Sequence, residues 1–251
     1  MMKVTFVHHS CFVVELDETI LVFDYFPPEA VEQVHFHGKM PQLDPNKQIY
    51  VFASHSHKDH FSLEVLKWAD TFSHIMYVLS KDIRLGRNYL LRHDIDPSIK
   101  KRIRFVAPLE KYTIGSIEVE TMRSTDEGVA FLVTAEGQNI YHAGDLHWWN
   151  WGERGELYCE AIGSAYKKEI KRVAKHHIDV AFVVLDGRMK EGYAFGMNYF
   201  LEHVDVDMVF PMHMWQEYDL IKRLKRQPQL SKLADKVVDI DKENIIFDIQ
   251  S

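Results

Sequence analysis

The residues best suited to chemistry in this chain lie in one short stretch, residues 54–60. Within six consecutive positions it contains three imidazoles and one carboxylate: His55, His57, Asp59 and His60. Imidazole nitrogen and carboxylate oxygen are ligands that zinc and comparable divalent ions accept, and no thiol is needed. The stretch directly follows residues 48–53, an apolar run typical of a buried strand. A turn at the end of that strand can aim the side chains in two directions, so the pattern predicts a site for one metal ion or for two adjacent ions.

The spacing His55-x-His57-x-Asp59-His60 resembles the motif of the metallo-β-lactamase superfamily. The resemblance implies an α/β fold, a four-layer αββα sandwich, built as a single domain over residues 1–251. It also implies a hydrolytic centre with one or two metal ions at one edge of the sandwich. In that centre, His55 and His57 serve the first ion, and Asp59 and His60 serve the second.

The resemblance implies two further ligands later in the chain. Asp145 follows an apolar run and a glycine, and it matches the aspartate of the superfamily's Gly-Asp element, which bridges the two ions. His213 ends the apolar run 208–213 and matches the final metal histidine, which completes the second site. The resemblance implies a catalytic role for two of the carboxylate ligands, Asp59 and Asp145. Asp59 orients the nucleophile while it remains a ligand, and Asp145 holds the two ions together.

Two residues are expected to support these ligands without binding the ions. Asp24 lies in the strand expected over residues 19–25, where the superfamily has an aspartate that supports the metal loop. His142 precedes the Gly-Asp element, and we interpret it as a supporting or packing residue and not as a ligand.

The chain departs from the superfamily at one ligand position. After the strand expected over residues 117–122, the superfamily has a third histidine for the first ion. Here the matching position is Ser124, with Thr125 or Asp126 as near alternatives. A hydroxyl is a weak ligand unless it is deprotonated, so the first ion either keeps two histidines and a bridging carboxylate or recruits Asp126, with a preference for ions such as manganese. The alternative is a plain turn with side-chain capping.

Four residues are candidate contacts to a substrate. His9 lies in a turn between two expected strands, and a similar His-Ser occurs near the N-terminus of lactonase-like members that resemble ascorbate-6-phosphate lactonases; an ordinary turn histidine is the alternative. Trp149 is one of three tryptophans after Asp145, which either line a cleft or cap the core. Asp186 and Arg188 end an apolar strand, where a carboxylate is suited to orient a metal ligand and a guanidinium to bind a substrate anion. A salt bridge between the last two is the alternative.

Apolar runs alternate with helical segments along the chain, as in an α/β layered domain. Helices are expected over residues 62–69, 81–92, 153–177, 194–204 and 216–233. Strands are expected within residues 3–16 and over residues 19–25, 48–53, 75–79, 103–106, 112–122, 178–185, 208–213 and 245–249.

Composition narrows the function further. With 251 residues, 46% of them hydrophobic, the chain is long enough for one sizeable domain. A net charge of −7 argues against broad electrostatic capture of nucleic acid or of an anionic membrane. Two cysteines are too few for a disulfide framework, and neither a signal peptide nor an apolar stretch of membrane-spanning length is visible. We therefore expect a cytoplasmic protein that acts on a small molecule, with its oligomeric state, including a homo-oligomer, left open.

These features favour a metal-dependent hydrolase that uses a metal-activated water on a small ester, lactone or phosphodiester, with zinc or manganese as the ion. A nuclease of the same superfamily is one alternative, although the acidic charge counts against it. A non-catalytic metal-binding or sensor protein is the other alternative, because one histidine ligand is missing.

Overall fold

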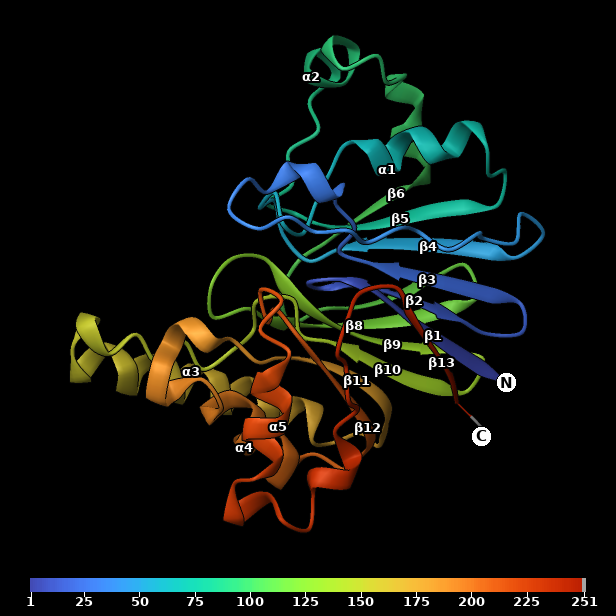
Figure 1. Cartoon of the computed structure of the whole chain (residues 1–251). Helices are drawn as coiled ribbons and strands as arrows, with labels where there is room; N and C mark the ends of the chain where they lie inside the picture. Colours follow the sequence, from blue (N-terminus) through green and yellow to red (C-terminus); the bar gives the residue numbers. More distant parts are fainter. Residues whose placement is uncertain (250–251) are drawn as a thin grey trace. The chain divides into compact units, whose positions relative to one another are not determined.

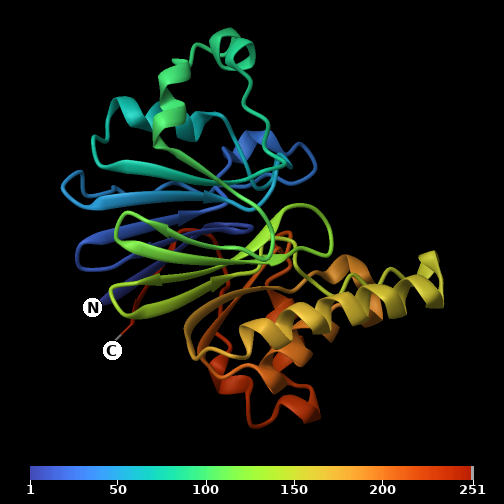
Figure 2. The ribbon, with the colours of Figure 1, turned by 180° about the vertical axis from the view of Figure 1, so that it is seen from behind.

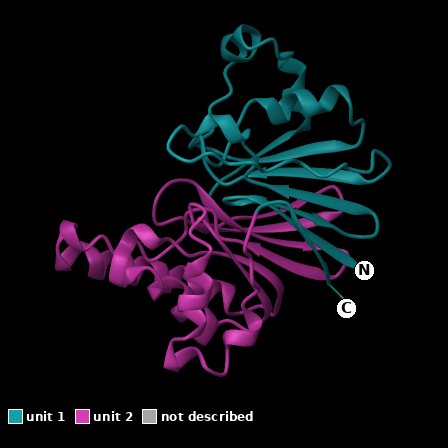
Figure 3. Cartoon of the chain, viewed as in Figure 1, with its two compact units in different colours: residues 1–107, 243–251 teal, residues 108–242 magenta. Residues whose placement is uncertain are grey.

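The computed structural model describes residues 1–249 and has a mixed α/β fold with two β-sheets. The α/β fold class predicted from the sequence is confirmed. The chain divides into two compact units, teal and magenta in Figure 3: residues 1–107 with the last strand, and residues 108–242. The single domain predicted from the sequence stays a prediction. Within the described part of the chain, no helix is long and apolar enough to cross a lipid bilayer.

The first unit is built on a seven-stranded sheet in the order β13-β1-β2-β3-β4-β5-β6 (Figure 1). The pairs from β13 to β3 are antiparallel, and the pairs from β3 to β6 are parallel. The strands are β1 (Met2–His8), β2 (Cys11–Glu15), β3 (Thr19–Phe23), β4 (Gln48–Ala53), β5 (Ile75–Ser80), β6 (Ile103–Val106) and β13 (Ile245–Ile249).

The short helix α1 (Glu64–Lys67) follows the metal motif and packs on one face of the first sheet. Its Val65 lies in a core cluster with Ile49 and Val51, which are alternate residues of β4 and therefore point to the same face. In β5, the hydroxyl of Tyr77 donates a hydrogen bond to the carbonyl of Val65 at 2.9 Å. These contacts hold α1 on the sheet and so fix the C-terminal end of the motif.

The helices of the first unit are shorter than the sequence predicted. α1 has only four residues, and the helix expected over residues 81–92 begins only at α2 (Arg87–Arg92). Gly86, the residue before α2, has extended backbone with ψ 148°. Asp82 accepts a hydrogen bond from the backbone amide of Ser56 at 2.8 Å. A tertiary contact to the metal motif therefore overrides the local helical pattern.

The second unit is built on a six-stranded sheet in the order β12-β11-β10-β9-β8-β7. β10, β11 and β12 pair in parallel, and the remaining pairs are antiparallel. The strands are β7 (Lys111–Ile114), β8 (Ile117–Arg123), β9 (Val129–Ala135), β10 (Gln138–His142), β11 (Ile178–Val184) and β12 (Val206–Met212).

Helices connect the parallel strands of the second unit. α3 (Glu156–Val173), the long helix in Figure 2, links β10 to β11, and α4 (Phe195–His203) links β11 to β12. The helix predicted over residues 216–233 is shorter. α5 (Asp219–Lys225) ends before Pro228, which begins a separate 3-10 turn, because proline has no amide hydrogen to continue the helix.

In each unit, the parallel strands end side by side at their carboxyl ends. β3 and β4 are paired up to their C-terminal ends. Asp24 directly follows β3 and Ser54 directly follows β4, so the two residues lie at neighbouring strand ends. β11 and β12 are paired in the same way, so that Asp186 and His213 follow at one edge of the second sheet. The carboxyl ends of parallel strands are where open α/β sheets bind their ligands.

Candidate metal centre

In the first unit, Asp24 ties together the two ends of the metal motif. It is fully buried and has a left-handed backbone, with φ +46°. One carboxylate oxygen accepts a hydrogen bond from the amide of Ser54 at 2.7 Å, and the other accepts one from the Ser54 hydroxyl at 2.6 Å. The second oxygen also lies 2.7 Å from Nδ1 of His60. The shape of the motif therefore depends on a residue thirty positions earlier in the chain.

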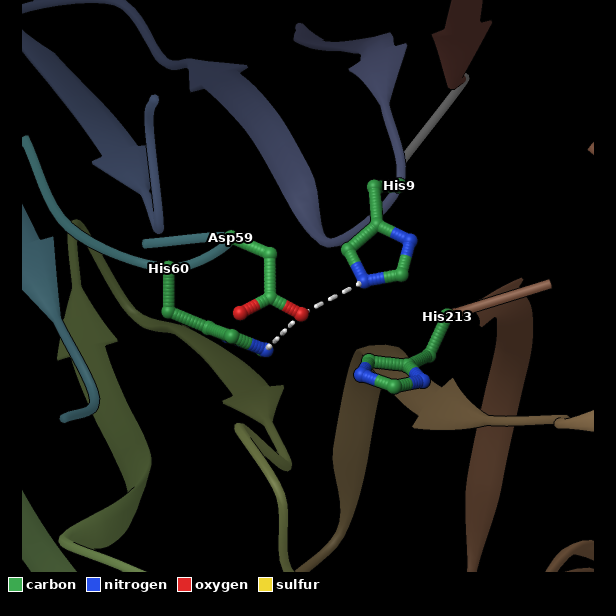
Figure 4. A group of neighbouring side chains, drawn as sticks. All are labelled: His9, Asp59, His60 and His213. Atoms are coloured by element: carbon green, nitrogen blue, oxygen red, sulfur yellow. Dashed lines mark ion pairs between the residues drawn. The ribbon is translucent and has the colours of Figure 1, made fainter. Parts of the chain in front are cut away.

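The contact with Asp24 selects one tautomer of the His60 ring. A carboxylate only accepts hydrogen bonds, so Nδ1 of His60 carries a proton, and in the neutral ring the lone pair is on Nε2. This Nε2 lies 3.8 Å from Oδ2 of Asp59. Figure 4 marks the pair with a dashed line. In metal-binding histidines, the ring nitrogen that does not bind the metal usually donates a hydrogen bond to a carboxylate or carbonyl. His60 has this arrangement: Nδ1 contacts a buried carboxylate, and Nε2 faces a second potential ligand.

His55 and His57 contact each other directly. Nε2 of His55 lies 2.9 Å from Nδ1 of His57, and Nδ1 of His55 lies 3.0 Å from the Ser54 hydroxyl. A separation of 2.9 Å is that of a hydrogen bond. Two ligands of a tetrahedral zinc ion, at bond lengths near 2.1 Å, lie about 3.4 Å apart. This pair must therefore open by about half an ångström to bind one ion together.

His9, predicted as a substrate contact, lies beside the motif residues. It sits in the turn between β1 and β2, with φ +49°, and is buried. Its Nε2 lies 3.4 Å from Oδ2 of Asp59, and its ring centroid lies 5.9 Å from that of His60 (Figure 4). The three residues each offer a ligand atom within 4.8 Å of the others, in a group that could hold a metal ion. The sequence indicated a place for His9 near the substrate, but not this direct approach to Asp59 and His60, because a turn histidine alone does not show which side chains it meets.

In the second unit, Asp145 follows a tight turn at the end of β10. Gly144 has φ +50°, and its amide donates a hydrogen bond to Nδ1 of His142 at 3.1 Å. His142 is thus a buried residue that shapes the turn before Asp145. Oδ1 of Asp145 lies 3.5 Å from Nε2 of His213.

The other nitrogen of His213 contacts Asp186. His213 follows β12 with φ +63°, and its Nδ1 donates a hydrogen bond to Oδ2 of Asp186 at 2.9 Å. Burial alone raises the pKa of Asp186, but hydrogen bonds from His213 and Arg188 hold this pKa well below its usual range. The ionised Asp186 keeps a proton on Nδ1, so in the neutral ring of His213 the lone pair is on Nε2, the nitrogen that faces Asp145. This repeats the arrangement of His60 and Asp24.

Arg188 forms the salt bridge with Asp186 that the sequence offered as an alternative. Its Nε lies 3.0 Å from both carboxylate oxygens. The guanidinium lies 4.6 Å from the centre of the Trp215 ring and 5.7 Å from that of Trp151, within the range of cation–π attraction. The side chain is 45% exposed, so the group stays open to solvent while two aromatic rings and a carboxylate fix its position.

Trp149, the other candidate substrate contact, packs behind Asp145. Only 5% of the residue is exposed, and its indole donates a hydrogen bond to the carbonyl of Asp145 at 2.9 Å. Its ring contacts those of His147 and His213, with centroids 5.1 and 5.7 Å away. The observed contacts are therefore those of a residue that supports the Asp145 loop.

The segment in which the superfamily has its third histidine forms a capped turn. The Ser124 hydroxyl accepts a hydrogen bond from the amide of Asp126 at 3.1 Å, and Asp126 is exposed. The Thr125 hydroxyl donates to the carbonyl of His147 at 2.6 Å and accepts from its amide at 2.9 Å. Thr125 thereby braces the loop that follows Asp145. Sequence reasoning missed this role, because the contact joins residues twenty-two positions apart.

Comparison with known proteins defines the class. A family model described as a beta-lactamase superfamily domain matches residues 3–151, more than half of the chain, so the chain belongs to this family. The structure is similar to that of Igni18, a metallo hydrolase from the archaeon Ignicoccus hospitalis, with a TM-score of 0.64 and 16% identity over 99% of both chains. It is also similar to the metallo-β-lactamase fold protein YhfI from Bacillus subtilis, with a TM-score of 0.58 and 12% identity over 99% of this chain and 100% of that one. The metallo-β-lactamase fold is thus confirmed, and the lactonase-like subgroup stays a prediction.

One further neighbour shows how widely chemistry varies on this fold. CmlA from Streptomyces venezuelae, a diiron β-hydroxylase, has a TM-score of 0.50 and 14% identity, over 86% of this chain and 45% of that one. A shared fold therefore does not determine the reaction, which has to be argued from the site.

Proposed function

We propose that the protein is a metal-dependent hydrolase that acts on a small ester, lactone or phosphodiester. The observation that carries this proposal is the pairing of two buried histidines with two buried carboxylates. Asp24 holds Nδ1 of His60, and Asp186 holds Nδ1 of His213. In each case the other ring nitrogen, Nε2, faces a further aspartate oxygen, at 3.8 or 3.5 Å. These separations are too long for hydrogen bonds but suit ligands that share a metal ion.

We assign the metal ligands as the sequence motifs predict, with one or two divalent ions, zinc or manganese: His55, His57, Asp59, His60, Asp145 and His213. These residues would hold an ion that, when bound, would supply a water of lowered pKa, near 7, and a Lewis acid for the oxygen of the bond to be cleaved. The chain's own residues do the positioning. Asp24 and Asp186 fix the tautomers of their histidines, and Asp59 accepts a hydrogen bond from the attacking water and so orients it.

Arg188 is the proposed contact for an anionic group of the substrate. Two of its nitrogens contact Asp186, and among the described residues its Nη1 donates no hydrogen bond. A guanidinium held by a carboxylate and by Trp215 loses little freedom when it binds an anion, which favours a substrate that carries a carboxylate or phosphate. A small-molecule substrate, rather than nucleic acid, stays our expectation because of the net charge of −7.

The proposal is tested by reconstitution. The protein is stripped with a chelator, dialysed, and reloaded with zinc or manganese, and hydrolysis of simple esters, lactones and phosphodiesters is measured. We expect turnover that depends on metal and falls at least about 100-fold in His60→Ala. Asp17→Asn, at an exposed carboxylate outside the site, is the matched control and should keep full activity.

A non-catalytic metal-binding protein is the second candidate. Two observations favour it: the direct hydrogen bond between His55 and His57, and the capped turn at Ser124. Stoichiometric metal binding without turnover of any ester, lactone or phosphodiester would support this second candidate and refute the hydrolase.

A further inference from the structure

We propose that His9 is itself a metal ligand, which joins Asp59 and His60 in a three-ligand site within the first unit. The proposal rests on the proposed function, since it takes the motif residues to bind metal. It adds a ligand that the motif of residues 55–60 does not contain. It also assigns His9 a different role from the substrate contact that its sequence position indicated.

The distances between the three side chains carry the argument. Oδ2 of Asp59 lies 3.4 Å from Nε2 of His9 and 3.8 Å from Nε2 of His60. A charge-assisted hydrogen bond between imidazole and carboxylate is shorter, about 2.7–2.9 Å. Ligands at neighbouring corners of a tetrahedral zinc site lie about 3.4 Å apart. The three atoms are therefore spaced for an ion among them and not for hydrogen bonds to one another.

The backbone of His9 points to the same role. His8 pairs with Cys11 across the two strands, so His9 and Ser10 form the turn between β1 and β2. At φ +49°, His9 is in the left-handed region, where glycine and asparagine are favoured in tight hairpin turns. A residue other than glycine is uncommon in this conformation, although histidine adopts it more readily than most, and the turn sets the direction of the His9 side chain.

Aromatic neighbours fix the direction of the His9 ring. The ring is buried, with the ring of Phe26 at 6.0 Å and that of Phe36 at 5.4 Å between centroids. It meets the ring of His60 at 5.9 Å with an interplanar angle of 70°. Rings set at steep angles can direct their nitrogens at one point from different sides. Ligands held in this way are preorganised, and preorganisation favours metal binding because little freedom is lost.

The test removes the imidazole and keeps the turn. His9→Gly and His9→Asn both tolerate a positive φ, so the hairpin keeps its backbone while the ligand is lost. All proteins carry His177→Ala, because the exposed His177 lies with Asp179 and Asp207 in another group that could bind an ion adventitiously. Cobalt(II) replaces zinc as a spectroscopic probe, and its stoichiometry, dissociation constant and visible absorption spectrum are measured on the full chain.

We expect His9→Gly to weaken cobalt binding more than about 100-fold, beyond the effect usual for residues that only support a ligand. We also expect free imidazole to enter the vacated space and restore both the affinity and the visible spectrum. Ser10→Ala, in the same turn, is the control and should bind cobalt as the parent does. Circular dichroism in chelator should show the same fold in every variant.

Three results would overturn the assignment. If His9→Gly binds cobalt with the parent's affinity and spectrum, His9 is not a ligand, while the proposed function stands. If its affinity falls but imidazole restores nothing, His9 acts by packing alone. If the parent protein itself binds no cobalt, the ligand role and the proposed function both fail.

Discussion

Replacing Asp24 by asparagine tests whether one buried carboxylate organises the metal motif. Asparagine has nearly the same size and tolerates the φ of +46°. Its carbonyl oxygen can still accept the amide of Ser54, but its NH₂ group cannot accept from the Ser54 hydroxyl or from Nδ1 of His60. The variant therefore loses two hydrogen bonds to a charged acceptor without a change in shape.

The magnitude follows from those two contacts. Hydrogen bonds to charged groups contribute about 1.5–3 kcal/mol each to stability, so the losses sum to about 3–6 kcal/mol. Removing a buried negative charge offsets part of this sum, and we expect the free energy of unfolding of the metal-free protein to fall by about 2–4 kcal/mol. Because the His60 tautomer is no longer fixed, zinc affinity should also fall by roughly 10–100-fold.

Two assays measure these effects: urea unfolding in chelator, and zinc titration against a competing dye. Asp82→Asn is the matched control. Asp82 accepts a hydrogen bond from one backbone amide of the motif, that of Ser56, and the carbonyl oxygen of an asparagine can accept the same bond. Unchanged stability and zinc affinity in Asp24→Asn would refute the account of how the motif is held. If stability and zinc affinity fell equally in both variants, the effect would come from the loss of any negative charge near the motif and not from the specific contacts of Asp24.

Four further predictions follow from other parts of the structure. Thr125→Val removes the hydroxyl that braces the backbone of His147, so urea unfolding should show a loss of about 1–3 kcal/mol, whereas an unchanged midpoint would contradict the bracing role. Gly196→Ala would place a methyl group 2.5 Å from the His147 ring, and we expect this overpacking to lower the melting temperature and to cost about 1–3 kcal/mol. The hydrogen bond to Asp205 raises the pKa of His177, so its ion pairs stabilise the fold below the ordinary pKa of 6.5 and are lost as pH rises through the higher folded value. His177→Gln should therefore lower stability at pH 6 but not at pH 9, and the difference should shrink in high salt because the group is exposed. Zinc at a hundred times its dissociation constant should stabilise the native state by about 2.7 kcal/mol, and calorimetry that finds no shift on chelation would count against a resident ion.

The sequence predicted well those strands whose formation depends on the residues of the segment itself. The apolar run before the metal motif is β4, and the runs before Asp186 and His213 are β11 and β12. These parallel strands are buried over most of their length, which leaves a nearly continuous apolar run in the sequence. Helices were less predictable. The segment expected to begin a helix at Lys81 does not, because Asp82 bonds to the distant Ser56.

The sequence also determined which residue types are available as ligands, because the spacing from His55 to His60 is itself the signal. The sequence also indicated Asp24 as a support for the metal loop and Asp186 as suited to orient a ligand. Only the tertiary structure shows which histidine each carboxylate contacts: Asp24 contacts His60 and Asp186 contacts His213, over 36 and 27 positions. The sequence indicated His9 only as a candidate substrate contact, and its close approach to Asp59 depends on the turn conformation and on how β1 lies in its sheet. Strand order and register set such distances, and no local pattern encodes them.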